Sequence, residues 1–288
     1  MINMESFLNS SGQGLSLFPA KPLLMIKSRN NSTVRYVRKL HRKKARRDTG
    51  LFIMEGARSV TELIASGHPV DTLIYNPLEG ETVRSLAVSL GERAVSGVYE
   101  AAGEIMDYIS PGQNSQGILA LVPQPRWEIP RQGEPSGFYI ALEEVSDPGN
   151  LGTIIRSGVA FACAGIFLVG DCVDPFNPKT VRSTAGQILR APVFFVENMN
   201  EMSRLSDELG LDRFFFSPRG EIPFYPHDTK KSKLFIFGSE ARGFSCSKNN
   251  KAETFFLPME NNVESLNLGV CVSIIMEKTY SFCKDRSG

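Results

Sequence analysis

The chain has 288 residues, of which 42% are hydrophobic and 22% charged, and its formal net charge is +1. These values are typical of a globular protein long enough for two domains, and no apolar run reaches the roughly 18 residues of a membrane helix. The start of the chain also lacks the basic opening of a secretion signal. We therefore expect a cytoplasmic protein with no membrane partner.

Residues 1–26 show little periodicity, and we expect them to form a loosely ordered extension. The stretch that follows, 27–47, contains ten Lys or Arg and no acid, so the rest of the chain carries the acidic excess. A solvated basic helix is the ordinary interpretation of a charge run, but a block of one sign favours contact with a phosphate backbone. The residues predicted to contact RNA are Arg29, Arg35, Arg38, Lys39, Arg42, Lys43, Lys44, Arg46 and Arg47.

Helical and strand patterns alternate after this point and predict a small α/β RNA-binding domain over 27–122. The predicted elements are a helix over 34–47, a strand over 51–55, a helix over 57–67, a strand over 71–76, a helix over 81–90 and a strand over 117–122. The segment 123–137 holds four prolines and two glycines and is predicted to be the linker between two domains.

The second domain, 138–288, is predicted to be a mostly parallel sheet with helices on both faces. Its strands are apolar at consecutive positions, as expected when both faces of a sheet are covered. The predicted strands are 138–144, 165–170, 192–197, 213–218, 233–239 and 254–258. Since parallel sheets bind ligands at the carboxyl ends of their strands, the polar residues that follow these strands are candidate site residues.

Three stretches follow strands in this way. In "DPGNLGTIIRSG" (147–158), Asn150 is predicted to cap a helix, and Arg156 is a cation near a helix start, where the helix dipole disfavours it. "LFIFGSEARGF" (234–244) ends a strand at Gly238, where a ligand can approach the backbone. "SLN" (265–267) precedes a long apolar helix. Taken singly, each stretch fits an ordinary turn or capped helix.

Familiar alternatives are disfavoured. The chain has no phosphate-binding G-x-x-x-x-G-K-[ST] motif, and "SGQGLS" near its start lacks the strand and helix of a dinucleotide fingerprint. The five cysteines never form C-x-x-C, and three histidines are few for a metal site or a catalytic triad. We expect no metal site.

In this order, the three stretches resemble the motifs of the SpoU (TrmH-type) family of RNA ribose 2′-O-methyltransferases. "LPMENNVESLNLGVCVSI" (257–274) is similar to the third motif, and "NPKTVRSTAGQILRAPV" (177–193) to a stretch between the first two. The basic segment and the residues after it look like the start of a ribosomal-protein-like substrate domain. The resemblance covers about residues 138 to 283 and is specific only in combination.

The resemblance implies a SPOUT-like fold with a deep trefoil knot, a homodimer formed through the knotted region, and S-adenosylmethionine as cofactor. It places the cofactor against the backbone at Gly238, Leu257 and Leu266. It also assigns the central role in catalysis to Arg156, with the side chains of Asn150, Glu240, Ser265 and Asn267 around it.

The implied substrate is RNA, and the separate first domain favours ribosomal RNA. A tRNA-directed enzyme and a noncatalytic RNA-binding or ribosome-assembly protein on the same fold are the alternatives. A degenerate relative should have lost Arg156, Asn267 or Gly238, and this sequence keeps all three.

Overall fold

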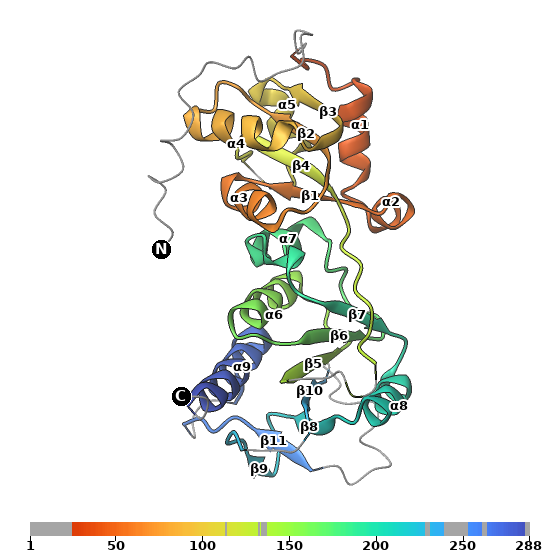
Figure 1. Ribbon diagram of the computed structural model, residues 1–288, viewed down its shortest axis with the longest axis vertical. Helices are drawn as coiled ribbons and strands as arrows, with labels where there is room; N and C mark the ends of the chain where they lie inside the picture. Colours follow the sequence, from red (N-terminus) through yellow and green to blue (C-terminus); the bar gives the residue numbers. More distant parts are fainter. Residues whose placement is uncertain are drawn as a thin grey trace.

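The computed structural model describes residues 25–112, 114–131, 133, 137–227, 231–238, 253–260 and 264–285. Two sheets stand one above the other along the long axis of the molecule, with helix α7 (Pro178–Thr184) between them (Figure 1). Within the described residues, no helix is both long and apolar enough to cross a membrane.

The first sheet has four strands in the order β1-β4-β2-β3. Strand β4 runs antiparallel to both of its neighbours, whereas β2 and β3 are parallel. Helices cover both faces: α1 and α5 pack on one apolar cluster, and α3 and α4 on another. The elements are α1 (Ser32–Lys39), α2 (Lys43–Thr49), β1 (Leu51–Glu55), α3 (Ala57–Ser66), β2 (Val70–Tyr75), α4 (Glu81–Gly91), β3 (Ala94–Glu100), α5 (Gly103–Ile109) and β4 (Ile118–Pro123).

The basic segment differs from its prediction because it forms two helices and not one. Asn31 caps α1 by accepting hydrogen bonds from the N–H groups of Thr33 and Val34. The chain leaves the helix at Leu40, and α2 begins only at Lys43. The apolar spacing of Val34, Val37 and Leu40 ends at this break, and the mostly basic residues that follow carry no clear periodicity to mark the start of a second helix.

The second sheet has seven strands in the order β7-β6-β5-β10-β8-β11-β9, and every strand pair in it is parallel. Both faces of its central strands are buried, which confirms the prediction from consecutive apolar residues. The strands are β5 (Phe138–Glu143), β6 (Gly165–Val169), β7 (Val193–Val196), β8 (Asp212–Phe216), β9 (Ile222–Pro223), β10 (Lys233–Phe237) and β11 (Thr254–Phe256).

Helices flank this sheet on both sides (Figure 1). Helix α8 (Met199–Leu209) covers one face, and α6 (Pro148–Ala160) and α9 (Leu268–Asp285) cover the other. A short 3-10 helix, η2 (Gln187–Leu189), follows α7. The knot implied by the resemblance depends partly on segments outside the described residues and stays a prediction.

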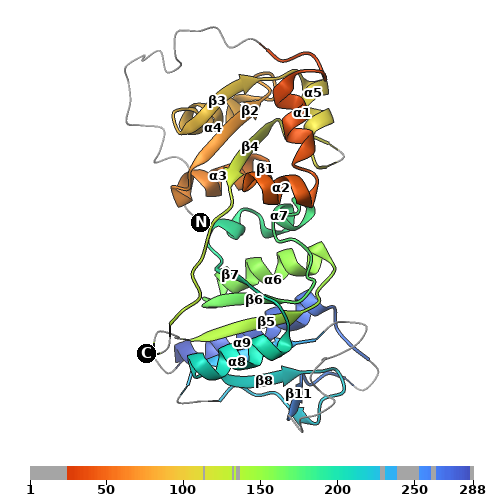
Figure 2. The same cartoon turned by 90° about the vertical axis from the view of Figure 1, so that its right-hand side faces the viewer.

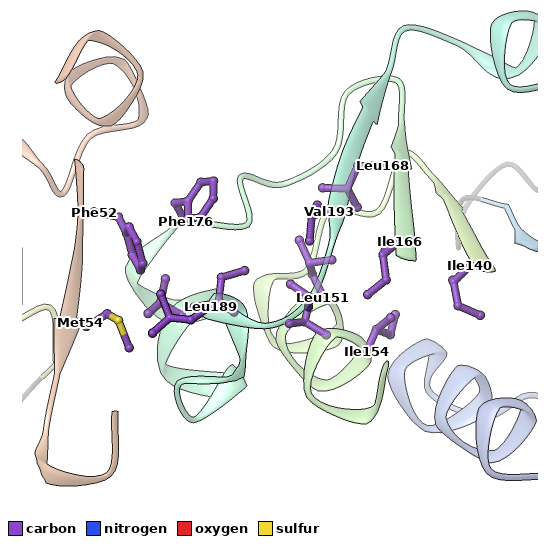
Figure 3. Packing of buried hydrophobic residues seen from close by; sticks show 14 of the residues in the cluster. Phe52, Met54, Ile140, Leu151, Ile154, Ile166, Leu168, Phe176, Leu189 and Val193 are labelled. Atoms are coloured by element: carbon purple, nitrogen blue, oxygen red, sulfur yellow. The ribbon is translucent and has the colours of Figure 1, made fainter. Parts of the chain in front are cut away.

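One apolar cluster continues from the first sheet into the second half of the chain. Phe52 and Met54 of β1 face Phe176 and Leu189, and the ring centroids of Phe52 and Phe176 lie 5.0 Å apart (Figure 3). The described linker residues 124–131 and 133 form no helix or strand. Because the two halves share a core, this linker is not the only connection that holds them together.

A buried ion pair reinforces the same boundary. Arg46 of α2 is 2% exposed, and its Nε and Nη2 donate hydrogen bonds to Asp174 Oδ2 at 2.9 and 2.6 Å. Its Nη1 donates to the Leu40 carbonyl at 2.8 Å. The other carboxylate oxygen of Asp174 accepts from the Phe176 N–H at 2.9 Å. Arg46 therefore fixes the junction between α1 and α2 onto the loop that follows β6.

Candidate active site and nucleic-acid surface

The carboxyl ends of β5 and β10 lie side by side and define the edge of the sheet where the polar motifs meet. Leu142 pairs with Phe237 in the parallel register of these strands, and Gly238 follows directly. Gly238 is partly buried. A residue without a Cβ at this position leaves the backbone open to a ligand.

The loop after β5 leads into α6, and the helix cap differs from the prediction. Asp147 is the N-cap: its Oδ1 accepts a hydrogen bond from the Asn150 N–H at 2.7 Å, and Pro148 occupies the first helical position. The position of Pro148 was the signal, because proline at N1 places the cap one residue earlier. Asn150, predicted as the cap, lies inside the first turn, and its side chain is thereby available for another contact.

That contact joins the first and third motifs. Asn267 Nδ2 donates to Asn150 Oδ1 at 2.8 Å, across 117 positions of sequence. Asn267 Oδ1 also accepts from the Val270 N–H at 3.3 Å, so the same amide caps α9. Asn150 is 7% exposed, which places this bond at the boundary between core and solvent.

Helices α6 and α9 approach each other closely along this line. A Cβ on Gly269 would lie 3.2 Å from Thr153 Cβ and 3.4 Å from Asn150 Cα, so a larger residue there would require Thr153 to shift by a few tenths of an ångström. One turn further along both helices, the hydroxyls of Ser157 and Ser273 are 2.7 Å apart. Sequence reasoning missed this serine pair.

Arg156 is exposed on α6. Gly152 and Thr153 precede Arg156 by one helical turn and flank it on the surface of α6. Gly152 packs against Ser183 of α7, and Thr153 packs against α9. Within the described ranges, Arg156 makes no hydrogen bond and no ion pair, so its donors are available to a ligand.

The other predicted site residues are distributed around this edge. Leu257 is buried just after β11. Leu266, which immediately precedes Asn267, packs against the apolar cluster that contains Leu257. Ser265 is exposed in the segment that leads to α9. Glu240 lies outside the described residues.

Burial disfavours the thiolate form of two of the described cysteines. Burial raises the pKa of the Cys163 thiol to about 12 and that of Cys271 to about 11. These thiols are protonated at neutral pH, and protonated thiols are poor nucleophiles and metal ligands. Among the described residues, no group of three or more His, Cys, Asp or Glu is placed to hold a metal ion.

Eight of the nine basic residues predicted to contact RNA are exposed on α1, on α2 or next to them. The ninth, Arg46, corrects the prediction: its guanidinium is buried, and it is bound by Asp174 and the Leu40 carbonyl. The exposed residues are Arg29, Arg35, Arg38, Lys39, Arg42, Lys43, Lys44 and Arg47.

Comparison with known families agrees with this arrangement. Residues 137–277 match the SpoU rRNA Methylase family, and residues 31–120 match the MRM3-like substrate binding domain. The chain therefore contains a SpoU methylase domain preceded by an MRM3-like substrate-binding domain. Its carboxyl-terminal half is called the SpoU domain below.

Relatives of the whole chain are RNA methyltransferases. This chain is 26% identical over 252 residues to the 23S rRNA (guanosine(2553)-2′-O)-methyltransferase RlmP of Bacillus subtilis. The aligned region covers 87% of this chain and 97% of RlmP. The chain is 24% identical over 258 residues to the 23S rRNA (uridine(2479)-2′-O)-methyltransferase of Streptomyces viridochromogenes, with 87% and 90% covered. The crystal structure of an AdoMet-bound rRNA methyltransferase from Sinorhizobium meliloti superposes with a TM-score of 0.77 at 28% identity, covering 90% and 97%.

The bond between Asn150 and Asn267 leads to a first prediction. Asn267→Ser should preserve the helix cap, since serine and asparagine cap equally well, but serine is too short to reach Asn150. We expect the free energy of unfolding to fall by about 1 kcal/mol, because a part-buried acceptor loses its donor, and methyl transfer to fall with it. Urea unfolding and initial rates measure both.

The matched control is Asn198→Ser at the N-cap of α8, where Asn198 accepts from the Glu201 N–H at 3.0 Å, remote from the site. It should change neither quantity by more than a few tenths of a kcal/mol. Equal behaviour of the two variants would mean that Asn267 acts only as a cap.

Proposed function

We propose that this chain transfers a methyl group from S-adenosylmethionine to a ribose 2′-hydroxyl of ribosomal RNA. The observation that supports this most is the hydrogen bond between Asn267 and Asn150, because it joins two SpoU motifs at the carboxyl edge of a parallel sheet. Gly238 directly follows the neighbouring strand β10 at the same edge. The activities named for the bacterial relatives support ribose and ribosomal RNA as the target.

The residues present fit the cofactor. Gly238 offers a backbone without a side chain, and Leu257 and Leu266 offer apolar surface and peptide groups. Such a surface suits an adenosine ring and an aliphatic chain. Bound there, S-adenosylmethionine supplies a methyl group on a positively charged sulfur that becomes a neutral leaving group.

Such a donor would support an in-line displacement, in which the 2′-oxygen would bond to the methyl carbon while the carbon–sulfur bond would break and leave its electron pair on sulfur. The protein must align the hydroxyl and accommodate the loss of its proton. A guanidinium holds its proton too tightly to act as a base, but the five N–H donors of Arg156 suit a bidentate clamp on an adjacent phosphate. In this role Arg156 orients the ribose and stabilises the developing alkoxide, while the proton passes to a phosphate oxygen or to water.

We also propose that two copies of the chain associate through α6 and α9. Val270 is 45% exposed at the start of α9, and Ile274 one turn later is partly exposed. Arg156 and Thr153 are exposed on the adjacent surface of α6. A second copy placed here covers apolar surface beside the candidate site. Light scattering of the purified protein should give twice the mass of one chain.

We predict that S-adenosylmethionine binds without added metal. The site offers peptide groups and apolar side chains, so affinity should not depend on a divalent ion. Isothermal titration calorimetry with and without a chelator should give equal dissociation constants. Loss of binding on chelation would make the cofactor assignment wrong.

The substrate class is tested by presenting purified ribosomal RNA and purified tRNA to the protein with methyl-labelled cofactor. We expect label in ribosomal RNA and little in tRNA, since an N-terminal domain with exposed basic helices provides contacts away from the target nucleotide. Preferential labelling of tRNA would favour the tRNA-directed alternative. Tight RNA binding with no label in either would favour a noncatalytic RNA-binding protein.

A further inference from the structure

Two arginines of the N-terminal domain gather around one aromatic ring. Arg29 Cζ lies 4.7 Å and Arg38 Cζ 5.0 Å from the ring centroid of Tyr108. Arg38 comes from α1, Tyr108 from α5, and Arg29 from the turn before α1. Helices α1 and α5 are neighbours at the end of the molecule away from the SpoU domain, as both views show (Figures 1 and 2).

Contacts within the N-terminal domain hold Tyr108 and Arg38 in place. Tyr108 is partly buried and packs against the apolar cluster that contains Val34 and Val37 of α1. Arg38 Nη1 donates to the Tyr108 carbonyl at 3.1 Å. His41 Nε2 lies 3.0 Å from the Ile109 carbonyl. The ring and one guanidinium are therefore oriented before any ligand arrives.

The charges of this cluster are uncompensated. Neither Arg29 nor Arg38 forms an ion pair within the part of the chain that the structure describes, whereas Arg84 pairs with Glu81 and Arg204 with Glu208. Burial lowers the pKa of His41, so the imidazole is neutral at pH 7 and adds no positive charge. Two like charges held against one ring repel each other until an anion lies between or beside them.

We propose that Arg29, Tyr108 and Arg38 form a binding site for the phosphodiester backbone of RNA, with the Tyr108 ring as the scaffold that orients both guanidiniums. Aromatic faces attract guanidinium groups and leave their N–H edges available, and those edges match phosphate oxygens. The sequence predicted the two arginines as RNA contacts but not Tyr108, which lies outside the basic segment. The choice of RNA as ligand rests on the proposed function.

Helices α1 and α5, which carry Arg38 and Tyr108, lie far from α6 in both views, so the site should act on binding and not on the chemical step (Figures 1 and 2). Removing it should raise KM for RNA and leave kcat and the affinity for S-adenosylmethionine unchanged.

The test measures binding of a fluorescein-labelled oligouridylate by anisotropy at salt concentrations between about 50 and 200 mM. Arg29→Met combined with Arg38→Met should weaken binding about tenfold or more and reduce the salt slope by about 1 to 2. Tyr108→Leu should weaken it about fivefold although no charge is lost, since two cation–π contacts disappear. Tyr108→Phe keeps the ring and should bind like the parent protein.

Arg84→Met removes an exposed, ion-paired arginine of the same domain and is the control for net charge. Equal losses in Arg84→Met and in the double variant would overturn the site. Parent-like RNA binding by Tyr108→Leu would also overturn the site. The same holds if the cluster is needed for binding to vesicles of anionic phospholipid but not for binding to RNA. If RNA binding depends on the cluster but no RNA is methylated, the proposed function fails and the site stands. If RNA is methylated but these variants bind it like the parent protein, the proposed function stands and the site fails.

Discussion

Replacing Arg156 with alanine is expected to lower the rate of methyl transfer by about 10²- to 10³-fold, the usual effect of losing one preorganised stabiliser of a developing oxyanion. The fold should persist, because Arg156 is exposed while Leu151, Ile154 and Ile155 anchor the same helix in the core. Alanine is also the best helix former. Single-turnover kinetics with saturating cofactor, alongside calorimetry of cofactor binding, separate the chemical step from binding.

Arg156→Lys is the sharper variant, since an ammonium keeps the charge but cannot reproduce a bidentate clamp. It should restore little of the lost rate. Arg204→Ala, which removes an exposed arginine from α8 on the opposite face of the sheet, should react like the parent protein. Nearly full activity of the lysine variant would reject the clamp, and a parent-like rate for the alanine variant would remove Arg156 from the site.

The second large effect concerns stability. Asp174→Leu should lower the free energy of unfolding by about 3 to 5 kcal/mol, because it leaves the buried charge of Arg46 without its partner. Adding Arg46→Met should recover much of this loss, since an apolar pair of similar volume replaces two buried charges. Urea unfolding of the parent, both single variants and the double variant completes the cycle.

The exposed pair of Arg204 and Glu208, whose oxygen and nitrogen are 2.6 Å apart, is the control for this cycle. Glu208→Ala should cost less than about 1 kcal/mol, because solvent screens an exposed pair. Should Asp174→Leu cost no more than Glu208→Ala, the pair between Arg46 and Asp174 would not contribute to the joint between the two halves.

The shared core also decides how RNA binding should be probed. Removing the N-terminal domain would expose Phe176 and Leu189, which Phe52 and Met54 cover (Figure 3). A truncated protein would therefore lose stability together with RNA contacts. Substitutions at exposed positions such as Arg29 and Arg38 separate the two effects.

The sequence predicted the second sheet well, because its strands carry apolar residues at consecutive positions and both of their faces are buried. It missed β3, whose residues are mostly half exposed and which contains Gly97, so no apolar run marks it. It also missed α5, which has only seven residues and shows too little periodicity to be recognised.

The candidate site was predictable in part for a physical reason. Parallel strands end at a common edge, and this brings the stretches around Asn150 and Gly238 together from sequence order alone. The direct bond between Asn150 and Asn267 and the inward turn of Arg46 depend on packing that a linear pattern does not encode. In a run of ten cations, nothing in the sequence marks the one whose partner lies 128 positions away.

The most direct measurement follows the position of the transferred methyl group. Ribosomal RNA is incubated with the protein and methyl-labelled S-adenosylmethionine and then hydrolysed with alkali. A methyl group on the 2′-oxygen removes the nucleophile that cleaves the neighbouring phosphodiester, so ribose methylation leaves the label in alkali-stable dinucleotides. We expect the label there, and expect it to be lost with Arg156→Ala. Label in mononucleotides would mean that the base is methylated, and would contradict a ribose 2′-O-methyltransferase.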